Sequence, residues 1–317
     1  MTSVLVSAPY ILPVIERFRP LFAQKNIELI LANVEERLNE AELLQYAGQF
    51  DGLICGDDRL TERVLEACTP RLKAISKWGT GIDSIDQVAA ARLGVQIFRT
   101  PNAFTLPVAD SVMGYMLSFV RRLPWMDKAM KQGEWEKIPG RSLSECTLGV
   151  VGVGNCGKAV IRRARAFGMR ILGNDIIEIA PDFILEYGVE MTSLQNLLAQ
   201  SDFVSINCDL NPTSYHLMNA QTFGMMKSSA ILINVARGPV IEEPALIAAL
   251  QNQQIAGAAL DVFEVEPLPQ DSPLMKMDNV MLAPHNANSS PAAWERVHRN
   301  TIRNLFLGLG ITPPEEL

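Results

Sequence analysis

Short β-branched runs alternate with amphipathic segments along the first hundred residues. Strands are predicted at residues 4–7, 27–31, 52–55, 72–76 and 95–98. Helices are predicted at residues 14–24, 40–47, 61–68 and 84–93, with Thr61 and Ser84 as expected N-caps. Strands that alternate with helices are typical of a parallel sheet covered by helices on both faces.

A long helical segment, residues 105–131, separates this series from a second one, and Pro124 is its expected kink. The first half of the segment is apolar on most faces, which favours a helix buried between domains or subunits. Further strands are expected at residues 148–153, 170–174, 203–207, 231–234, 257–261 and 280–283, and a last helix at residues 289–309. The sequence therefore predicts an α/β protein with two doubly wound parallel sheets.

Composition narrows the class of protein. At roughly 100–200 residues per domain, 317 residues predict two domains, and a hydrophobic content of 48% suits buried cores. A formal net charge of −7 without a basic run argues against nucleic acid as a partner. The most apolar stretch, residues 108–120, is too short for a membrane span, and no signal peptide is evident.

The cysteines bear on compartment and metal content. There are five, and no pair has CxxC spacing, so neither a disulfide framework nor a zinc site is indicated. We therefore expect a reducing, cytoplasmic location and no metal.

The most informative local motif is a glycine loop, Gly152-Val-Gly154-Asn-Cys-Gly157, which follows an apolar run and opens a helix. Gly152 allows the tight turn, Gly154 lets the backbone approach a pyrophosphate, and Gly157 allows close packing of helix on strand. The helix start offers free N–H groups and the positive end of its dipole to phosphates. Glycine turns between strand and helix are common, so this motif needs a second signal.

Asp175 supplies that signal, since it lies 23 positions (175 − 152) beyond Gly152, after the next expected strand. An acidic residue at this spacing binds ribose hydroxyls. A carboxylate there repels a 2′-phosphate, so NAD is favoured over NADP; the alternative is that Asp175 only caps a loop. Cys156, at the helix start, is either a reactive thiol whose alkylation blocks cofactor binding or an inert small residue.

A hydride transfer at an alcohol carbon needs a base, and the chain has three histidines. His298 lies between arginines in the last helix and is expected at the surface, and His216 lies in a polar loop. His285 follows an apolar strand, at the strand end where open α/β sheets bind ligands. His285 is therefore the favoured base.

A carboxylate substrate also needs a cation. Arg237 follows an apolar strand, and its guanidinium can hold a carboxylate with two hydrogen bonds, although a surface charge is the alternative. Glu266 is a candidate partner that would stabilise the imidazolium of His285. Composition does not distinguish Glu266 from Glu264.

Three blocks of sequence resemble the D-isomer-specific 2-hydroxy acid dehydrogenases, in particular members similar to D-3-phosphoglycerate dehydrogenase. They are Asn234-Val-Ala-Arg237-Gly-Pro-Val, residues 259–267 and residues 278–285, and they follow the glycine loop in the family's order. Upstream, Trp78-Gly79-Thr80-Gly81-Ile82-Asp83 resembles the family's substrate-binding loop. The resemblance covers nearly the whole chain.

This resemblance implies hydride transfer between NAD(H) and carbon 2 of a D-2-hydroxy or 2-keto acid. Arg237 would bind the small carboxylate substrate, His285 would be the general acid/base, and Glu266 its carboxylate partner. The implied cofactor residues are Gly152, Gly154, Asn155, Cys156, Gly157, Asp175, Cys208, Ala236 and Asp261, the last beside the nicotinamide. The implied substrate residues are Trp78, Gly79, Thr80, Gly81 and Arg237.

The resemblance also implies the domain plan and the oligomer. A flavodoxin-like substrate-binding domain would comprise residues 1–104 plus 288–317, and a Rossmann NAD-binding domain residues 105–287. A homodimer would form through the cofactor domain and the long helix.

Three departures from the family pattern bear on the substrate more than on the reaction class. Asp209 stands where many members have proline. Ser84 stands where an asparagine often follows the aspartate of the substrate-binding loop. After His285, Asn286-Ala-Asn288-Ser-Ser replaces the small, apolar stretch that is usual in the family. Two alternatives remain: a phosphite or formate oxidoreductase on the same scaffold, and a non-catalytic NAD-sensing protein resembling the family's corepressors. The joint presence of Arg237, Glu266 and His285 argues against the second.

Overall fold

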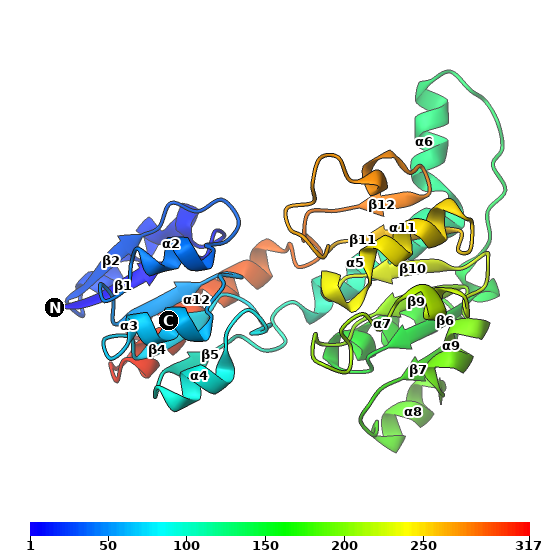
Figure 1. The fold of residues 1–317 in the computed structure, drawn as a ribbon. Helices are drawn as coiled ribbons and strands as arrows, with labels where there is room; N and C mark the ends of the chain where they lie inside the picture. The colour runs from blue at the N-terminus through cyan, green and yellow to red at the C-terminus, as the bar shows by residue number, and fades with distance from the viewer. The chain divides into compact units, whose positions relative to one another are not determined.

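The computed structural model describes residues 1–317 and contains two compact units. The first comprises Met1–Phe104 and Ser290–Leu317, and the second Thr105–Ser289. Each unit is built on its own parallel sheet (Figure 1). The chain returns to the first unit two residues later than the boundary expected from the sequence (290 against 288).

The first unit has five parallel strands in the order β2-β1-β3-β4-β5. The strands are β1 (Thr2–Val6), β2 (Ile27–Leu31), β3 (Gly52–Cys55), β4 (Ala74–Lys77) and β5 (Gln96–Phe98). The helices are a 3-10 helix (Leu12–Arg17), α1 (Arg19–Ala23), α2 (Glu40–Leu44), α3 (Glu62–Cys68), α4 (Gln87–Arg92) and α12 (Pro291–Gly308). This strand order is the flavodoxin-like one, which confirms the predicted architecture.

Local signals explain most helix starts in the first unit. The hydroxyl of Thr61 accepts a hydrogen bond from the amide of Val64 and caps α3, as predicted. The predicted cap at Ser84 is wrong, because Ile85 still pairs with Leu60 in a parallel bridge. Helix α4 begins two residues later, where the Asp86 carboxylate caps it.

The second unit has seven parallel strands in the order β12-β11-β10-β9-β6-β7-β8. They are β6 (Thr147–Val151), β7 (Arg170–Asn174), β8 (Val189–Met191), β9 (Phe203–Ile206), β10 (Ile231–Asn234), β11 (Gly257–Leu260) and β12 (Val280–Leu282). The order is that of a Rossmann sheet extended by one strand, so the predicted fold is confirmed. The short edge strand β8 is absent from the sequence-based prediction.

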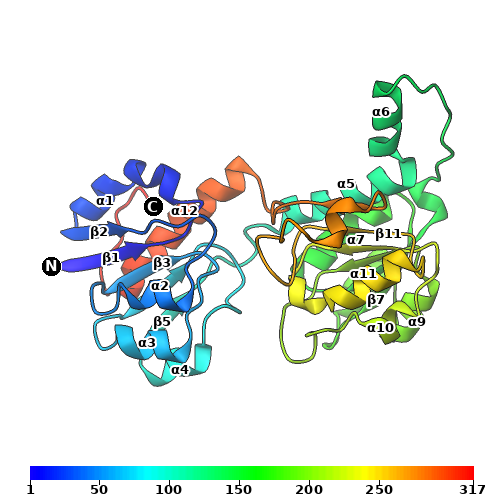
Figure 2. The same ribbon diagram turned by 45° about the horizontal axis from the view of Figure 1, so that its top comes forward.

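Helices cover both faces of this sheet (Figure 2). They are α5 (Thr105–Arg121), α6 (Leu123–Lys131), α7 (Asn155–Ala166), α8 (Pro181–Tyr187), α9 (Leu194–Gln200), α10 (Ala220–Phe223) and α11 (Glu243–Gln251). Short 3-10 helices span Leu143–Glu145, Gly238–Val240 and Pro273–Lys276. Alternate residues of β6 enter the two cores: Val150 packs with α5 and α7, whereas Val151 packs with α9, α10 and α11.

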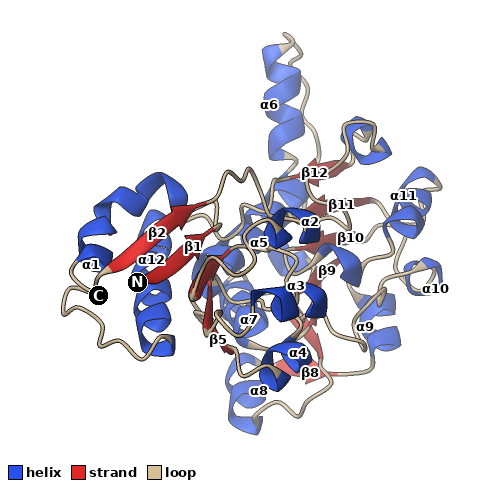
Figure 3. Cartoon of the chain, turned by 60° about the vertical axis from the view of Figure 1, so that its left-hand side comes forward, coloured by secondary structure: helices blue, strands red, loops and turns tan.

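The predicted long helix is two helices that meet at Arg122, whose φ is +58°. Pro124 cannot donate an amide hydrogen to the carbonyl of Val120, and that carbonyl accepts from the amide of Arg141 instead (3.0 Å). The apolar face of α5 is buried in the core of its own unit. Helix α6 has no buried residue and projects from the second unit (Figure 3). None of the helices combines the length and apolar character that crossing a membrane requires.

Gly308 tests the packing of α12 on the first sheet. A Cβ atom at Gly308 would lie 2.6 Å from Ala74 Cβ and 2.6 Å from Phe98 Cε2. We expect Gly308→Ala to lower the free energy of unfolding by about 1–3 kcal/mol, because an overpacked helix must shift. Urea unfolding followed by circular dichroism measures this change.

Gly114→Ala is the matched control, since Gly114 is an exposed residue of α5 where an added Cβ meets no atom within 4 Å. We expect this variant to be neutral or to gain up to about 1 kcal/mol of stability. Equal destabilisation by both variants would contradict the packing of α12 described here.

Candidate active site

The carboxyl ends of β10, β11 and β12 gather three of the predicted side chains. These strands are adjacent and parallel, so their carboxyl ends share one edge of the second sheet. Arg237 follows β10, Asp261 follows β11 directly, and His285 follows β12. This edge is where open α/β sheets bind ligands.

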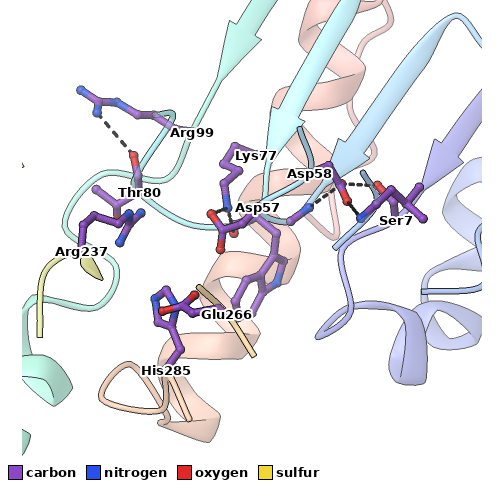
Figure 4. Close-up of polar contacts among 12 residues, drawn as sticks. Ser7, Asp57, Asp58, Lys77, Thr80, Arg99, Arg237, Glu266 and His285 are labelled. Atoms are coloured by element: carbon purple, nitrogen blue, oxygen red, sulfur yellow. Dashed lines mark hydrogen bonds and ion pairs between the residues drawn. The ribbon is translucent and has the colours of Figure 1, made fainter. Parts of the chain in front are cut away.

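His285 and Glu266 form a pair at this edge (Figure 4). The Nδ1 atom of His285 lies 3.2 Å from Oε2 of Glu266, and the two side chains are 22% and 17% exposed. The other carboxylate oxygen of Glu266 accepts a hydrogen bond from the amide of Phe263 (3.0 Å). A carboxylate at Nδ1 places a proton there, which leaves Nε2 as the nitrogen that exchanges protons with a substrate.

Buried Asp261 fixes the backbone that carries His285. Its carboxylate accepts hydrogen bonds from the amides of Asn286 (2.8 Å) and Ala287 (2.9 Å), and its carbonyl accepts from the amide of His285 (2.8 Å). These three bonds hold His285 in the left-handed region, with φ +51°. Burial raises the pKa of the Asp261 carboxyl, and the two amide hydrogen bonds oppose that shift.

Arg237 is placed by buried Asn234. The Asn234 side chain accepts from the amide of Ala236 (3.1 Å) and donates to the carbonyl of Arg237 (2.9 Å), which shapes the turn after β10. The next residue, Gly238, packs so tightly that a Cβ atom there would overlap the carbonyl of Phe263. The half-buried guanidinium of Arg237 therefore comes from a turn packed against the segment that carries Glu266.

The glycine loop has the conformation that a dinucleotide site needs. Gly152 has φ +89°, and a Cβ there would lie 2.5 Å from the amide nitrogen of Cys208. A Cβ at Gly157 would overlap the carbonyl of Gly152, whereas one at Gly154 meets nothing within 4 Å. No side chain caps α7, and the space beside Gly154 is open to a pyrophosphate at the start of this helix.

Asp175 lies beside this loop. Its Oδ2 accepts from the amide of Val153 (2.6 Å), and its Oδ1 accepts from the amide of Ile177 (3.1 Å). The half-buried carboxylate thus supports the loop and also lies where ribose hydroxyls are expected. These residues fit NAD.

The remaining predicted cofactor residues surround the glycine loop or the end of β10. Asn155 is exposed, while Cys156, Cys208 and Ala236 are half-buried. Burial raises the pKa of the Cys156 thiol, which favours the interpretation of Cys156 as an inert small residue over that of a reactive thiol. Burial also raises the pKa of Cys208 to about 11, and the charge of exposed Asp209 acts on both thiols in the same direction.

The predicted substrate loop belongs to the first unit. Trp78 is buried at 4% exposure, so its side chain supports the loop from within. Gly79 has φ +129°, and Thr80 donates a hydrogen bond to the carbonyl of Thr100 (2.9 Å). Gly81 is half-buried. The expectation that His298 lies at the surface is wrong, because His298 is 4% exposed and accepts a hydrogen bond from Trp78.

Several polar groups have no counterpart in the sequence-based prediction. His216 Nε2 lies 2.5 Å from Oε1 of Glu264, which forms a second histidine–glutamate pair. Lys77 is buried against Asp57 (3.0 Å), and Asp58 accepts from Ser7 (2.6 Å; Figure 4). Lys77 ends β4, and Asp57 and Asp58 follow β3, so their place at strand ends is the signal in the sequence that marks them. No group of three or more potential ligands is placed to hold a metal ion.

Comparison with known proteins identifies relatives over nearly the whole chain. The model of the D-isomer specific 2-hydroxyacid dehydrogenase NAD-binding domain matches residues 113–287. A glyoxylate reductase of Thermofilum pendens is 40% identical over 281 residues, which cover 86% of this chain and 83% of that protein. A D-3-phosphoglycerate dehydrogenase of Methanocaldococcus jannaschii is 38% identical over 260 residues, covering 81% of this chain and 49% of that protein.

The solved structures agree with these relatives. The crystal structure of D-lactate dehydrogenase from Aquifex aeolicus, complexed with NAD and lactic acid, has a TM-score of 0.87 and 27% sequence identity. The alignment covers 98% of this chain and 96% of that one.

A substitution at Gly154 should affect cofactor binding without affecting folding. Because an added Cβ meets no protein atom, we expect Gly154→Ala to leave the urea midpoint unchanged. The methyl group enters the expected path of the pyrophosphate, so NADH affinity should fall about tenfold or more. Gly157→Ala, which would overlap the Gly152 carbonyl, should lower both affinity and stability. Fluorescence titration of NADH measures the affinities, and unchanged binding to Gly154→Ala would argue against a cofactor in this loop.

Proposed function

The chain belongs to the D-isomer-specific 2-hydroxyacid dehydrogenases, a family of NAD-dependent oxidoreductases, and we propose that it reduces a short, unphosphorylated 2-keto acid. The observation that carries the proposal is the His285–Glu266 pair, held at the strand edge that also carries Arg237. Glyoxylate and hydroxypyruvate are the substrates that we favour. Relatives named glyoxylate reductase and hydroxypyruvate reductase, the latter from Thermotoga maritima at 36% identity, support this choice.

His285 is the proton donor in this proposal. Bound NADH supplies the hydride, which reaches carbon 2 of the keto acid. Nε2 of doubly protonated His285 gives its proton to the developing alkoxide, while Glu266 stabilises the imidazolium through Nδ1. In the oxidation direction, neutral His285 accepts the hydroxyl proton at Nε2. Glu266 keeps its carboxylate toward the ring because Phe263 holds its second oxygen.

Arg237 binds the carboxylate of the substrate and polarises the carbonyl oxygen. Its fixed fork of N–H groups suits both oxygens, and the Asn234 turn limits its movement. The family resemblance implies that the backbone amides of residues 79–81 also bind the substrate carboxylate. Asp261 positions His285, because its carboxylate holds the two amides that follow His285. The family resemblance also implies that Asp261 contacts the nicotinamide.

Buried charge beside the substrate loop supports a substrate without phosphate. Lys77 is 4% exposed, and its ammonium group contacts the carboxylate of Asp57 (3.0 Å) and the carbonyl of Trp78 (3.4 Å). An ammonium group satisfied by a carboxylate adds little attraction for a second anion. We therefore favour a reductase of small keto acids over the phosphoglycerate dehydrogenase-like activity expected from the sequence.

We extend the proposal to a cytoplasmic homodimer. Helix α6 buries none of its residues, and Leu123, Met130 and nearby Trp135 are 50%, 50% and 87% exposed. Apolar side chains that project in this way favour a second copy of the chain as their partner. Five free cysteines support a reducing compartment.

A substrate panel tests the proposed activity. With NADH, we expect kcat/KM for glyoxylate or hydroxypyruvate to exceed that for 3-phosphohydroxypyruvate by about tenfold or more. The reason is that the ammonium group of Lys77 is already paired with Asp57 and adds little attraction for a phosphate. Arg237→Ala should lower kcat/KM for each of these acids, since all share the carboxylate. The rate at which NADH is consumed measures kcat/KM for each acid.

Other outcomes of the panel discriminate the alternatives. Preference for the phosphorylated acid would contradict the proposed substrate class. Turnover of only phosphite or formate with NAD would show a different oxidoreductase on this scaffold. Tight NADH binding without turnover of any acid would indicate a sensor that does not catalyse.

A further inference from the structure

Helix α12 holds the substrate loop from three positions on the helix. Trp78 Nε1 donates to His298 Nδ1 (2.9 Å), and Ser76 donates to the carbonyl of Thr301 (2.7 Å). Asn300 donates to the hydroxyl of Thr100 (2.8 Å), whose amide in turn donates to the carbonyl of Gly79 (2.8 Å). The three contacts made by α12 join residues 200 or more positions apart in the sequence.

Of these contacts, the Trp78–His298 hydrogen bond involves the residue directly before Gly79 of the substrate loop. Both side chains are 4% exposed. The Trp78 ring stacks on Tyr10 (5.0 Å between centroids) and packs on Phe104 (5.5 Å) and Trp294 (6.1 Å). Only one polar atom of the indole exists, and His298 satisfies it. Loss of the acceptor would leave a buried donor unpaired beside Gly79.

We propose that His298 is a positioning residue for the substrate loop: its unprotonated Nδ1 accepts from the indole of Trp78, and this bond fixes residues 79–81. The inference rests on the proposed function, in which the amides of that loop bind the substrate carboxylate. His298 does not touch substrate in this account. His298 keeps the loop in the conformation that binds the substrate carboxylate, so its loss should raise KM for the keto acid.

The bond requires neutral His298, because a doubly protonated ring has no acceptor. Burial lowers the pKa of His298 below the ordinary value of 6.5; on its own helix Glu295 opposes that shift, and Arg17 of the first 3-10 helix reinforces it. Glu295 is itself paired with Arg17 (3.0 Å) and Arg299 (2.8 Å). The ring of Phe18 and the indole of Trp78 complete the surroundings.

The sign of the pH effect follows from that shift. Above pH 6.5 the imidazole is neutral in folded and unfolded chains, and the bond is intact. Below 6.5 an unfolded chain takes up the proton first, so the folded loop loses stability. The bond itself breaks only at more acidic pH, as His298 passes through its lowered pKa. KM for the keto acid should therefore be flat at neutral pH and rise in acid.

Three variants test the inference by steady-state kinetics at neutral pH. We expect His298→Leu and Trp78→Phe, which each remove one partner of the bond, to raise KM about fivefold or more with little change in kcat. His298→Asn restores an acceptor near the position of Nδ1 and cannot be protonated, so its KM should stay low and lose the rise in acid. Trp78→Phe keeps an aromatic ring in place and serves if His298→Leu does not fold.

Trp294→Phe is the matched control. Trp294 belongs to the same aromatic group, but its buried Nε1 has no hydrogen-bond partner. KM should therefore be unchanged in Trp294→Phe. An equal rise in KM for Trp294→Phe and Trp78→Phe would show loss of packing alone and would overturn the role of the hydrogen bond.

A measurement without substrate separates this inference from the proposed function. In ¹⁵N-labelled protein, the indole N–H signal of Trp78, assigned by its loss in Trp78→Phe, should be protected from exchange at neutral pH relative to a free indole at the same pH, and should lose that protection in acid or in His298→Leu. Rapid exchange at neutral pH in the unaltered protein would overturn the inference. Absence of turnover with every keto acid would contradict the proposed function, whereas normal turnover with KM unaffected by both variants would overturn only the positioning role.

Discussion

The carboxylate of Asp261 is the constraint on which the second unit's site depends. It is 1% exposed and lies directly after β11, where it accepts hydrogen bonds from the amides of Asn286 and Ala287 in the segment after β12. A buried carboxylate is costly unless hydrogen bonds satisfy it, so the segment after β12 must follow the path that supplies those amides. That path places His285 in the left-handed region and turns its ring toward Glu266. One desolvated side chain thus determines where His285, the proposed proton-transfer group, lies.

The same principle organises the other functional segments. Asn234, which is fully buried, shapes the turn that carries Arg237, and Asp175 holds the glycine loop by accepting the amide of Val153. In the first unit His298 satisfies the indole that precedes the substrate loop. In each case a wholly or partly buried polar group fixes irregular backbone, from a strand end for Asp261, Asn234 and Asp175 and from helix α12 for His298. The groups that we propose to meet ligands project from that backbone.

The sequence predicts the sheets, because parallel strands buried on both faces stand out as apolar runs. It also predicts the glycine loop and the strand-end residues Arg237 and His285, since spacing and position along the chain carry those signals. It does not predict β8, whose three residues are too few to show a period. It predicts a kink of the long helix at Pro124, but not the complete break at Arg122, where the amide of Arg141 takes the carbonyl of Val120. Contacts between distant residues leave no local pattern.

His298 shows this limit most clearly. Exposed Arg296 and Arg299 lie on either side of it in sequence, yet the helix face that it shares with Thr301 is buried against β4. The choice between Glu264 and Glu266 likewise depends on the fold, because each carboxylate pairs with a histidine from a different segment. Family resemblance selects Glu266 correctly for His285, which composition and spacing do not.

Comparison of His285→Asn with His216→Asn tests the central claim, that the imidazole held by Asp261 moves the proton. Both histidines have φ near +50° and pair with a glutamate, and asparagine tolerates that backbone. Turnover of a 2-keto acid at saturating NADH should fall by a factor of about 10² or more in His285→Asn, with NADH affinity retained, and stay near normal in His216→Asn. Near-normal turnover in His285→Asn, or an equal loss in both variants, would contradict the account.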